Sequence, residues 1–374
     1  MSNAHHPPPP LQLPVLRYGL QRQLLPILQD EWGPLSERDR QFLDVLALLP
    51  EEDGLARYQW CGNGRPPANR RWLLHAFLAK AVYGFATTKA LIEALRAQPT
   101  LHRLCGWQSA EEIPDEATFS RAFAQFAADQ LLQQLHATMI RTHCGPKLAG
   151  HASYDSTAVP ARERPAPLPP SPTQPPAPPR KPGRPKKGQE PPPAPPTRLQ
   201  LQPHRSLTEN LADLPQRCDN GCKTGSQGQP VYWRGFKLHL ASIDGDIPVS
   251  PILTSASTHD SQAAIPLMQM TIQRVQHLYD LGDAAYDAQA IHDFSRSLGH
   301  VPIIEPVQRG AWVPLDPAQR RRYGERSTAE RVNARLKDEF GARTVRVRGA
   351  LKVMAHLMFG VLTVAALAIW NRLG

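Results

Sequence analysis

The sequence contains few cysteines, five in 374 residues. An odd number at irregular spacing does not form the disulfide framework of a small secreted domain, and it favours a reducing compartment. Cys218 and Cys222 lie close together, but no second pair follows to complete a set of four zinc ligands. The cysteines therefore exclude a disulfide-rich protein and argue against a zinc site.

Long hydrophobic runs are also scarce. The N-terminal stretch PPPPLQLPVL is too rich in proline for a signal peptide, so we expect a cytoplasmic protein. Residues 351–370 are long and apolar enough to span a membrane, but Lys352 and His356 interrupt the first turns. Because the sequence has no second such run, we interpret this one as a helix in the core of a soluble enzyme and expect no membrane partner.

Acidic residues are outnumbered, with 33 Asp and Glu against 43 Lys and Arg, which gives a formal net charge of +10. A basic chain of this kind favours a polyanionic partner, nucleic acid first and an anionic membrane second. Charge alone does not decide between them, so the motifs along the chain must.

Residues 1–147 are expected to form an all-helical N-terminal domain. Apolar residues recur at a spacing of three and four in RRWLLHAFLAKAVYGF and TKALIEALRAQP, and Pro114 and Asp115 mark the start of a later helix. Thr118, Ser120 and Arg121 early in that helix are compatible with a helix-turn-helix-like DNA reader, although a plain helical bundle has the same pattern. We expect this domain to serve DNA binding or dimerisation.

Residues 148–374 carry strand-like runs: GHASYDSTAVP, and later VYWRGFKLHLAS, IPVSPILTSAS and HLYDLGDAAYD. Between the first two, residues 160–204 hold nearly half of the 40 prolines and few large apolar residues, so we expect a disordered insertion there. A helix at 286–298, the strand-like HVPIIEPV and two further helices complete the pattern. This order predicts an α/β domain in which helices flank a mixed sheet.

The stretch YGERSTAERVNARLKDEF, residues 323–340, is rich in helix formers. Apolar residues at helical spacing predict a buried stripe: Ala329, Val332, Leu336 and Phe340. A polar stripe lies about a quarter turn away: Tyr323, Arg326, Glu330, Asn333 and Lys337. Ion pairs between residues four apart on a solvated face, such as Arg326 with Glu330, would explain this stripe without a function.

Two aspartates stand at the ends of strand-like runs, Asp155 in SYDSTAVPA and Asp283 in LGDAAYDAQ. Each could simply cap the following turn. Strand ends in open α/β sheets are, however, where ligand-binding side chains gather. Together with Glu330, these residues give three carboxylates on or beside the sheet, which is enough to hold two Mg²⁺ ions at a phosphoryl-transfer site.

These motifs resemble a known family. YDST, GFKLHLAS, SASTHDSQAAIPLM and GDAAYDA, followed by Tyr323, Arg326, Glu330 and Lys337 at the Y-R-E-K spacing, are similar to the DDE transposases of bacterial insertion sequences that carry this signature. The N-terminal part, through PDEATFSRAF, is similar to the helical leader of the same group. The short interval between the second aspartate and the glutamate leaves no room for the large β insertion of some relatives. The proline-rich insertion departs from the usual pattern.

The resemblance implies an RNase H-like core on which Asp155, Asp283 and Glu330 are the catalytic, metal-binding triad. It implies two Mg²⁺ ions, with Mn²⁺ as a substitute, and contacts from Tyr323, Arg326 and Lys337 to DNA near the active site. The implied partners are double-stranded DNA, as transposon end repeats and target, and a second copy of the chain in a synaptic homodimer. The implied location is the bacterial cytoplasm, in association with the nucleoid.

Two other functions fit the same residues. A non-catalytic DNA-binding protein derived from such an element would use the basic segments, although it has no need of three carboxylates near phosphates. A metal-dependent RNase H-like nuclease would hydrolyse DNA without strand transfer. Asp280, Asp287, Glu325 and Glu339 lie close in sequence to the triad and compete with it as ligands.

Further basic stretches could bind DNA. RKPGRPKKG resembles an AT-hook, and a solubilising basic linker is the alternative; its candidate DNA-binding residues are Arg180, Lys181, Arg184, Lys186 and Lys187. RTVRVRG, residues 343–349, alternates Arg with Val as an edge strand with one basic face would. Trp233, Arg234 and Lys237 lie in the strand after the insertion, where core packing explains the tryptophan economically.

Overall fold

The computed structural model describes residues 34–165, 195–307 and 314–373, except residues 63, 65 and 226. The N-terminal part is helical: α2 Glu37–Leu48, α3 Glu51–Leu55, α4 Arg70–Val82, α5 Thr88–Ala97, α6 Pro99–Cys105, α7 Glu116–Ala128 and α8 Leu131–His143, with short 3-10 turns at Ala56–Tyr58 and Ala110–Glu112. Helix α7 begins as the sequence predicts, because the Asp115 side chain accepts a hydrogen bond from the Thr118 amide at 2.8 Å.

A six-stranded sheet follows: β1 Leu148–Pro160, β2 Asp219–Thr224, β3 Pro230–Ile243, β4 Ile247–Ser255, β5 Gln276–Gly282 and β6 Val301–Ile304. The strand order is β2-β3-β1-β5-β6, and β4 also pairs with β3. Strand β3 runs antiparallel to β1, β2 and β4, whereas β1 is parallel to β5 and β5 to β6. The predicted mixed sheet is confirmed.

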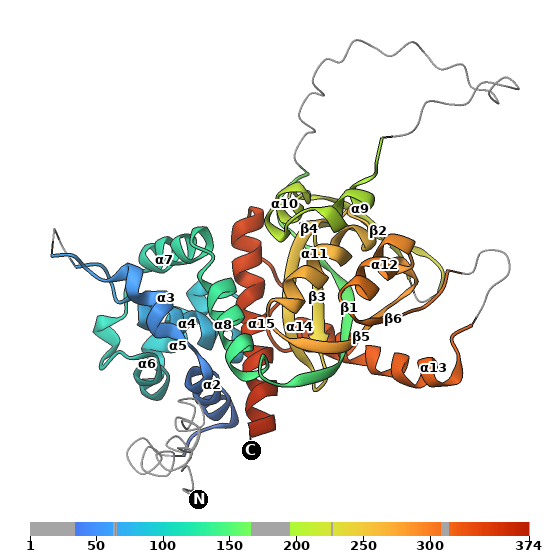
Figure 1. The fold of residues 1–374 in the computed structure, drawn as a ribbon. Coiled ribbons are helices and arrows are strands. Elements are labelled where there is room, and N and C mark those ends of the chain that lie inside the picture. The colour runs from blue at the N-terminus through green and yellow to red at the C-terminus, as the bar shows by residue number, and fades with distance from the viewer. Residues whose placement is uncertain are drawn as a thin grey trace, which may run out of the picture.

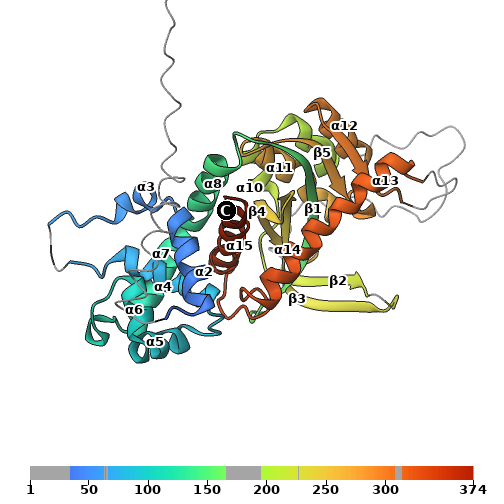
Figure 2. The same ribbon diagram turned by 90° about the horizontal axis from the view of Figure 1, so that it is seen from below.

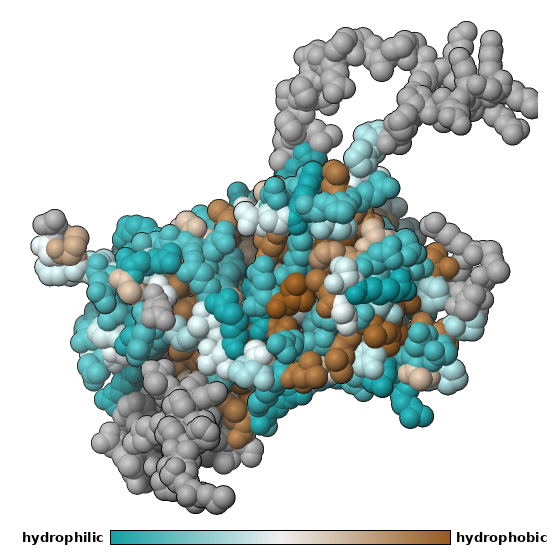
Figure 3. Space-filling model, in the orientation of Figure 1, coloured by the Kyte–Doolittle hydropathy of each residue, from teal (hydrophilic) through white to brown (hydrophobic). Residues whose placement is uncertain are grey.

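The remaining helices flank the sheet: α9 Arg198–Leu201, α10 Leu207–Asp213, α11 Ser261–Ile272, α12 Gln289–Ser297, α13 Pro317–Tyr323, α14 Ser327–Asp338 and α15 Ala350–Leu373, with 3-10 turns at Gln202–His204, Ala284–Tyr286 and Gly324–Arg326. Helices α11 and α12 lie across the sheet from α14 (Figure 2). On the face in Figure 3, the N-terminal helices present mostly hydrophilic side chains, while hydrophobic ones are visible over the sheet half.

Helix α15 holds the two halves of the molecule together. It packs against α2, α4, α7 and α8 on one side and against β4 and α14 on the other (Figure 1). By length and composition it is the one described helix that could cross a membrane, yet 89% of its most apolar stretch is buried in the protein. The prediction of a core helix is therefore confirmed, and α15 is part of one hydrophobic core that both halves share.

Two segments differ from the structure that the sequence predicted for them. Residues 198–204, assigned to the proline-rich insertion, form helical turns, and Gln202 is fully buried, with its side-chain amide donating to the Gln262 carbonyl at 2.6 Å. Residues 344–348 do not form the expected edge strand, because they connect α14 to α15 with no strand beside them, and Val345 is buried in the core. The AT-hook-like residues lie outside the described part of the chain.

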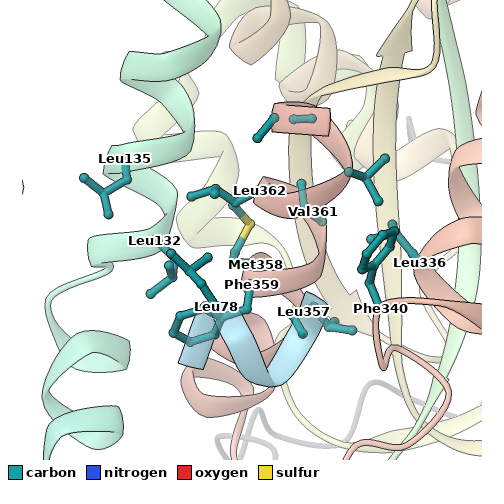
Figure 4. Packing of buried hydrophobic residues seen from close by; sticks show 14 of the residues in the cluster. Leu78, Leu132, Leu135, Leu336, Phe340, Leu357, Met358, Phe359, Val361 and Leu362 are labelled. Atoms are coloured by element: carbon teal, nitrogen blue, oxygen red, sulfur yellow. The ribbon is translucent and has the colours of Figure 1, made fainter. Parts of the chain in front are cut away.

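Close approach between α14 and α15 depends on Gly360. A β-carbon there would lie 2.9 Å from the Phe340 carbonyl oxygen and 3.3 Å from a methyl group of Leu336. Figure 4 shows Leu336 and Phe340 facing α15 in this contact. Both belong to the stripe predicted to be buried, and all four members of that stripe are buried.

We expect Gly360→Ala to lower the free energy of unfolding by about 1–3 kcal/mol, because overpacking forces the two helices apart. This loss should outweigh the gain of roughly 1 kcal/mol in helix propensity. Chemical denaturation measures it. Gly324→Ala is the matched control, since no atom lies within 4 Å of its added β-carbon, and it should not destabilise the protein. Equal effects of the two variants would contradict the packing argument.

Candidate active site

Asp155 and Asp283 lie on neighbouring parallel strands. Strand β1 pairs with β5 up to Ser153, which is opposite Leu281. Continuing this register by two residues places Asp155 opposite Asp283, with both side chains on the same face of the sheet. Asp283 directly follows β5, as predicted, but Asp155 lies within β1, because the strand continues to Pro160 through its pairing with β3.

Helix α14 carries Glu330 over this face of the sheet. The helix packs on β1 and β3, and the Asn333 side-chain amide donates a hydrogen bond to the Asp155 carboxylate at 2.9 Å. Asn333 lies one turn after Glu330, so this bond holds the part of α14 that carries Glu330 beside β1. Glu330 is exposed, with 58% of its side chain accessible, and it pairs with Arg326 as the sequence suggested.

The Arg326 guanidinium pairs with Glu330, and the charges of Asp155 and Asp283 also act on it. Burial alone would lower the pKa of Arg326, but Tyr323, Glu330, Asp155 and Asp283 together raise it above its ordinary value. The charges of all three carboxylates therefore act on one cation. The ion pair of Arg326 and Glu330 is thus more than a solvated surface pair.

The two aspartates resist ionisation. Burial raises the pKa of Asp155 from 3.8 to about 6, although the hydrogen bond from Asn333 and the charge of Arg326 oppose it, and the nearby Asp283 adds to the rise. Burial also raises the pKa of Asp283. One oxygen of Asp283 caps the next turn by accepting from the Ala285 amide at 2.9 Å. Two partly buried carboxylates side by side in this way are stabilised by a nearby cation.

This pKa has a measurable effect on stability. A folded-state pKa raised to about 6 means that Asp155 contributes stability below its unfolded value near 4, and this contribution is lost as the pH rises through 6. We compare the free energy of unfolding of Asp155→Asn with that of the original chain, with a chelator present. The difference should shift in favour of the variant by about 1–3 kcal/mol between pH 4.5 and pH 8. Denaturation at both pH values measures the gain. Glu339→Gln, at an exposed site, should show no such dependence, and a pH-independent difference for Asp155→Asn would contradict the assignment.

Tyr323 and Lys337 lie at the two ends of the polar stripe. The Tyr323 hydroxyl donates a hydrogen bond to Glu305 at 3.0 Å. Burial is the main cause that raises the pKa of Tyr323 to about 12, and the bond to Glu305 adds to the rise. Burial lowers the pKa of Lys337, and the neighbouring cations Lys223 and Arg343 lower it further. A cavity of about 470 Å³ opens beside Lys337, between α14 and the N-terminal helices. A phosphate near Lys337 would relieve the repulsion among these cations.

A fourth carboxylate next to the site was assigned no role from the sequence. Asp260 accepts from the Lys237 ammonium at 2.8 Å, and its negative charge helps to raise the pKa of Asp283. Burial would raise the pKa of Asp260 itself, but His239 and Lys237 hold it below its ordinary value. The stretch SASTHDSQAAIPLM, which contains Asp260, was the available signal, and its lysine partner lies on β3.

Asp280, a competing candidate, belongs to the opposite face of the sheet and is fully buried. Its carboxylate is hydrogen-bonded to the Tyr154 hydroxyl and His277 Nε2 at 2.7 Å, to the Ser295 hydroxyl at 2.6 Å and to His300 Nδ1 at 3.1 Å. Burial would raise its pKa, but these partners hold it well below the usual range. With its oxygens occupied, Asp280 is a structural anchor between the sheet and α12.

The other competing carboxylates are also committed elsewhere. Asp287 is hydrogen-bonded to His292 Nε2 at 3.0 Å and accepts from the Val307 amide at 2.8 Å, so it holds the loop after β6. Glu339 pairs with an arginine of its own helix at 3.5 Å. Glu325 is exposed and lines a separate hollow beside α13. Among the described residues, the three carboxylates around Arg326 remain the best candidate site.

Comparison with protein families identifies the family of the chain. A family model described as a transposase DDE domain matches residues 151–365. A second model, described as a transposase domain, matches residues 33–125, which include α2 and most of α7. No curated protein and no solved structure matches the chain. Since the first model covers more than half of the chain and all three carboxylates, the chain belongs to the DDE transposases of insertion sequences.

Proposed function

We propose that Asp155, Asp283 and Glu330 together bind divalent metal ions, Mg²⁺ or Mn²⁺, in this transposase. The observation that carries the proposal is geometric: the register of β1 and β5 puts the two aspartates on one face of the sheet, and Asn333 of α14 bonds to Asp155 on that face. The ion pair of Arg326 with Glu330, and the charges of the two aspartates acting on the same guanidinium, support it.

The donor set fits such ions. Carboxylate oxygens are the ligands that Mg²⁺ prefers, and the raised pKa values of the two aspartates favour a site that gains positive charge. When bound, a pair of ions would activate the attacking oxygen and stabilise the leaving oxygen at phosphorus. Asn333 would orient Asp155 by its hydrogen bond.

The cationic residues of the stripe would hold the DNA. Arg326 can offer its planar fork to a phosphate, and Lys337 a point charge. Tyr323 is held against Glu305 near the end of β6, within 5.7 Å of the Arg326 guanidinium as measured to the ring centre. These side chains would position the scissile phosphate over the carboxylates.

The reaction we propose has two steps. Water attacks the phosphorus at the transposon end, the bond to the 3′ oxygen breaks, and a free 3′-OH and a 5′-phosphate result. That hydroxyl then attacks a phosphorus of target DNA, and the target's 3′ oxygen leaves with a proton. The partners would be the terminal repeats and a target duplex, and a homodimer would bring two ends together in the bacterial cytoplasm, in association with the nucleoid.

A plasmid assay tests this function. Purified protein is incubated with a plasmid that carries the gene and its flanking DNA, together with a target plasmid, with Mg²⁺ or a chelator. We expect metal-dependent cuts at two discrete ends and joined products in the target. Cuts without joined products would show a nuclease that lacks strand transfer, and binding without cuts would overturn the enzymatic proposal.

Arg326 and Lys337 should affect the reaction differently from the carboxylates. Lys337→Ala should slow cleavage by about 10-fold to 100-fold, since it removes one phosphate contact but no metal ligand. Arg326→Ala should slow cleavage more than Lys337→Ala does, because the positive charge of Arg326 also stabilises the ionised forms of the three carboxylates. Single-turnover cleavage rates measure both, with the exposed Arg296→Ala on α12 as control. Complete loss in Lys337→Ala would contradict this division of roles.

A further inference from the structure

Strands β2 and β3 form a ribbon that leaves the body of the protein. Strand β1 pairs with β3 only from Gly235 onward, and β4 only from Phe236. Residues 230–234 of β3 therefore have β2 as their sole strand neighbour. Figure 2 shows this two-stranded ribbon projecting beyond the sheet on the side of α14.

Burial of apolar surface does not explain the ribbon. Residues 222–224 and 227–232 are exposed on both faces, and Tyr232 is 73% accessible. The main packing is that of Trp233 on Gly221, where an added β-carbon would come within 2.4 Å of the ring. An isolated pair of strands is only marginally stable, so an extension that exposes a tyrosine in this way suggests a partner.

The chemistry of the ribbon suits nucleic acid. Residues 220–237 contain Lys223, Arg234 and Lys237, five Asn, Gln, Ser and Thr residues, and no Asp or Glu. The acidic first residue of β2, Asp219, lies at the base of the ribbon, where it accepts a hydrogen bond from the Ser257 hydroxyl at 2.7 Å. Lys237 is engaged by Asp260. Among the residues that the structure describes, Lys223 and Arg234 have no ion-pair partner. Cations with amide and hydroxyl side chains are the groups that contact DNA backbones.

The two cations point to opposite faces of the ribbon. Lys223 is opposite Val231, whereas Arg234 lies three residues further along β3, so alternation along the strand puts them on different faces. The major groove is about 12 Å wide and admits a two-stranded ribbon, with phosphates on both sides. Cations on both faces fit a ribbon between the two backbones better than one lying flat on the duplex.

The ribbon is in line with the active site. Leu240 of β3 pairs with Asp155, and Tyr232 lies eight residues before it, a distance of about 26 Å at 3.3 Å per residue. A duplex whose axis runs along this direction covers the same distance in about seven or eight base pairs, at 3.4 Å per base pair. The charge of Lys223 also helps to lower the pKa of Lys337 on α14. Basic side chains therefore extend from the helix that carries Glu330 to the ribbon.

We propose that the β2–β3 ribbon is a DNA-binding arm that enters the major groove about seven or eight base pairs from the bond that is cut. Lys223 and Arg234 contact phosphates of the two strands, and Tyr232 contacts the groove. The position relative to the cut rests on the proposed role of Asp155, whereas DNA binding by the arm does not.

Salt dependence tests the contacts. Affinity for a mixed-sequence duplex of about 30 base pairs is measured without metal at several salt concentrations, for Lys223→Ala, Arg234→Ala and the control Arg296→Ala. Each arm variant should reduce the slope of log affinity against log salt by about 0.9, the contribution of one phosphate contact. Slopes equal to that of Arg296→Ala would overturn the proposal, because all three variants remove one exposed cation.

Crosslinking tests the position. Cys222 is exposed on the ribbon, beside Tyr232, and Cys61 is the other exposed cysteine among those described. In a Cys61→Ser chain, a photoactivatable group on Cys222 should crosslink the transposon end about seven or eight base pairs from the cut. A control chain with Cys61→Ser, Cys222→Ser and Ser297→Cys, labelled on α12, should not crosslink.

Absence of a Cys222 crosslink would overturn the proposal that the ribbon binds DNA. A crosslink at another distance would overturn its placement relative to the cut. If the arm crosslinks but Asp155→Asn still cleaves DNA, the active-site proposal fails and the arm stands, so the two failures are distinguishable.

Discussion

Alanine at Asp155, Asp283 or Glu330 should reduce metal-dependent cleavage by about 10³-fold or more, beyond the 10²–10³ typical of losing one hydrogen-bond donor at an active site. Each substitution removes a proposed ligand from the group of carboxylates around Arg326. DNA affinity should change little, because it comes mainly from Lys and Arg contacts to phosphate. Single-turnover cleavage and equilibrium binding of the same end duplex measure the two effects.

The matched controls are Glu325→Ala and Glu339→Ala, two exposed glutamates within ten residues of Glu330. Both variants should retain cleavage within a few-fold of the original chain, because Glu339 pairs with Arg335 and Glu325 lines a separate hollow beside α13. Cleavage by Glu330→Ala at the original rate, with loss in either control, would move the third ligand to that glutamate.

Asp280→Ala should destabilise the fold by about 3–5 kcal/mol, the range for removing one partner of a buried charged network. Four polar groups that now bond to Asp280 would be left buried without their acceptor, among them Tyr154 on β1 and Ser295 on α12. Denaturation curves measure the loss. Loss of activity in this variant should follow loss of folded protein, in contrast to the triad variants.

Asp293→Ala is the control for this effect, since Asp293 is an exposed carboxylate on α12 whose partners, Gln289 at 2.7 Å and Arg296 at 3.3 Å, belong to the same helix. It should change stability by less than about 1 kcal/mol. If Asp280→Ala kept full stability but lost cleavage, Asp280 would be a catalytic ligand and the structural reading would be wrong.

The sequence predicted those features that depend on periodicity. The buried stripe of α14 follows from helical spacing, and its polar stripe brings Arg326, Glu330 and Asn333 to one face. The apolar segment of α15 could be assigned to a core because Lys352 and His356 interrupt it. Asp280 remained a competing ligand from the sequence, and only the strand register and its buried hydrogen bonds assign it to the other face of the sheet from Asp283.

Features that depend on tertiary contacts could not be predicted. The bond from Asn333 to Asp155 joins residues 178 positions apart, and the pairing of Lys237 with Asp260 joins two segments with no shared pattern. The ribbon of β2 was missed because GCKTGSQGQP has the composition of a loop, and only its pairing with β3 makes it a strand.

Mn²⁺ binding is a direct test of a metal site formed by Asp155, Asp283 and Glu330. Mn²⁺ is titrated into the protein with an end duplex, and bound ions are counted by electron paramagnetic resonance. We expect bound Mn²⁺ in the original chain, loss of it in Asp155→Asn, Asp283→Asn and Glu330→Gln, and full retention in Glu325→Gln and Glu339→Gln. Unchanged Mn²⁺ binding in all three triad variants would contradict it.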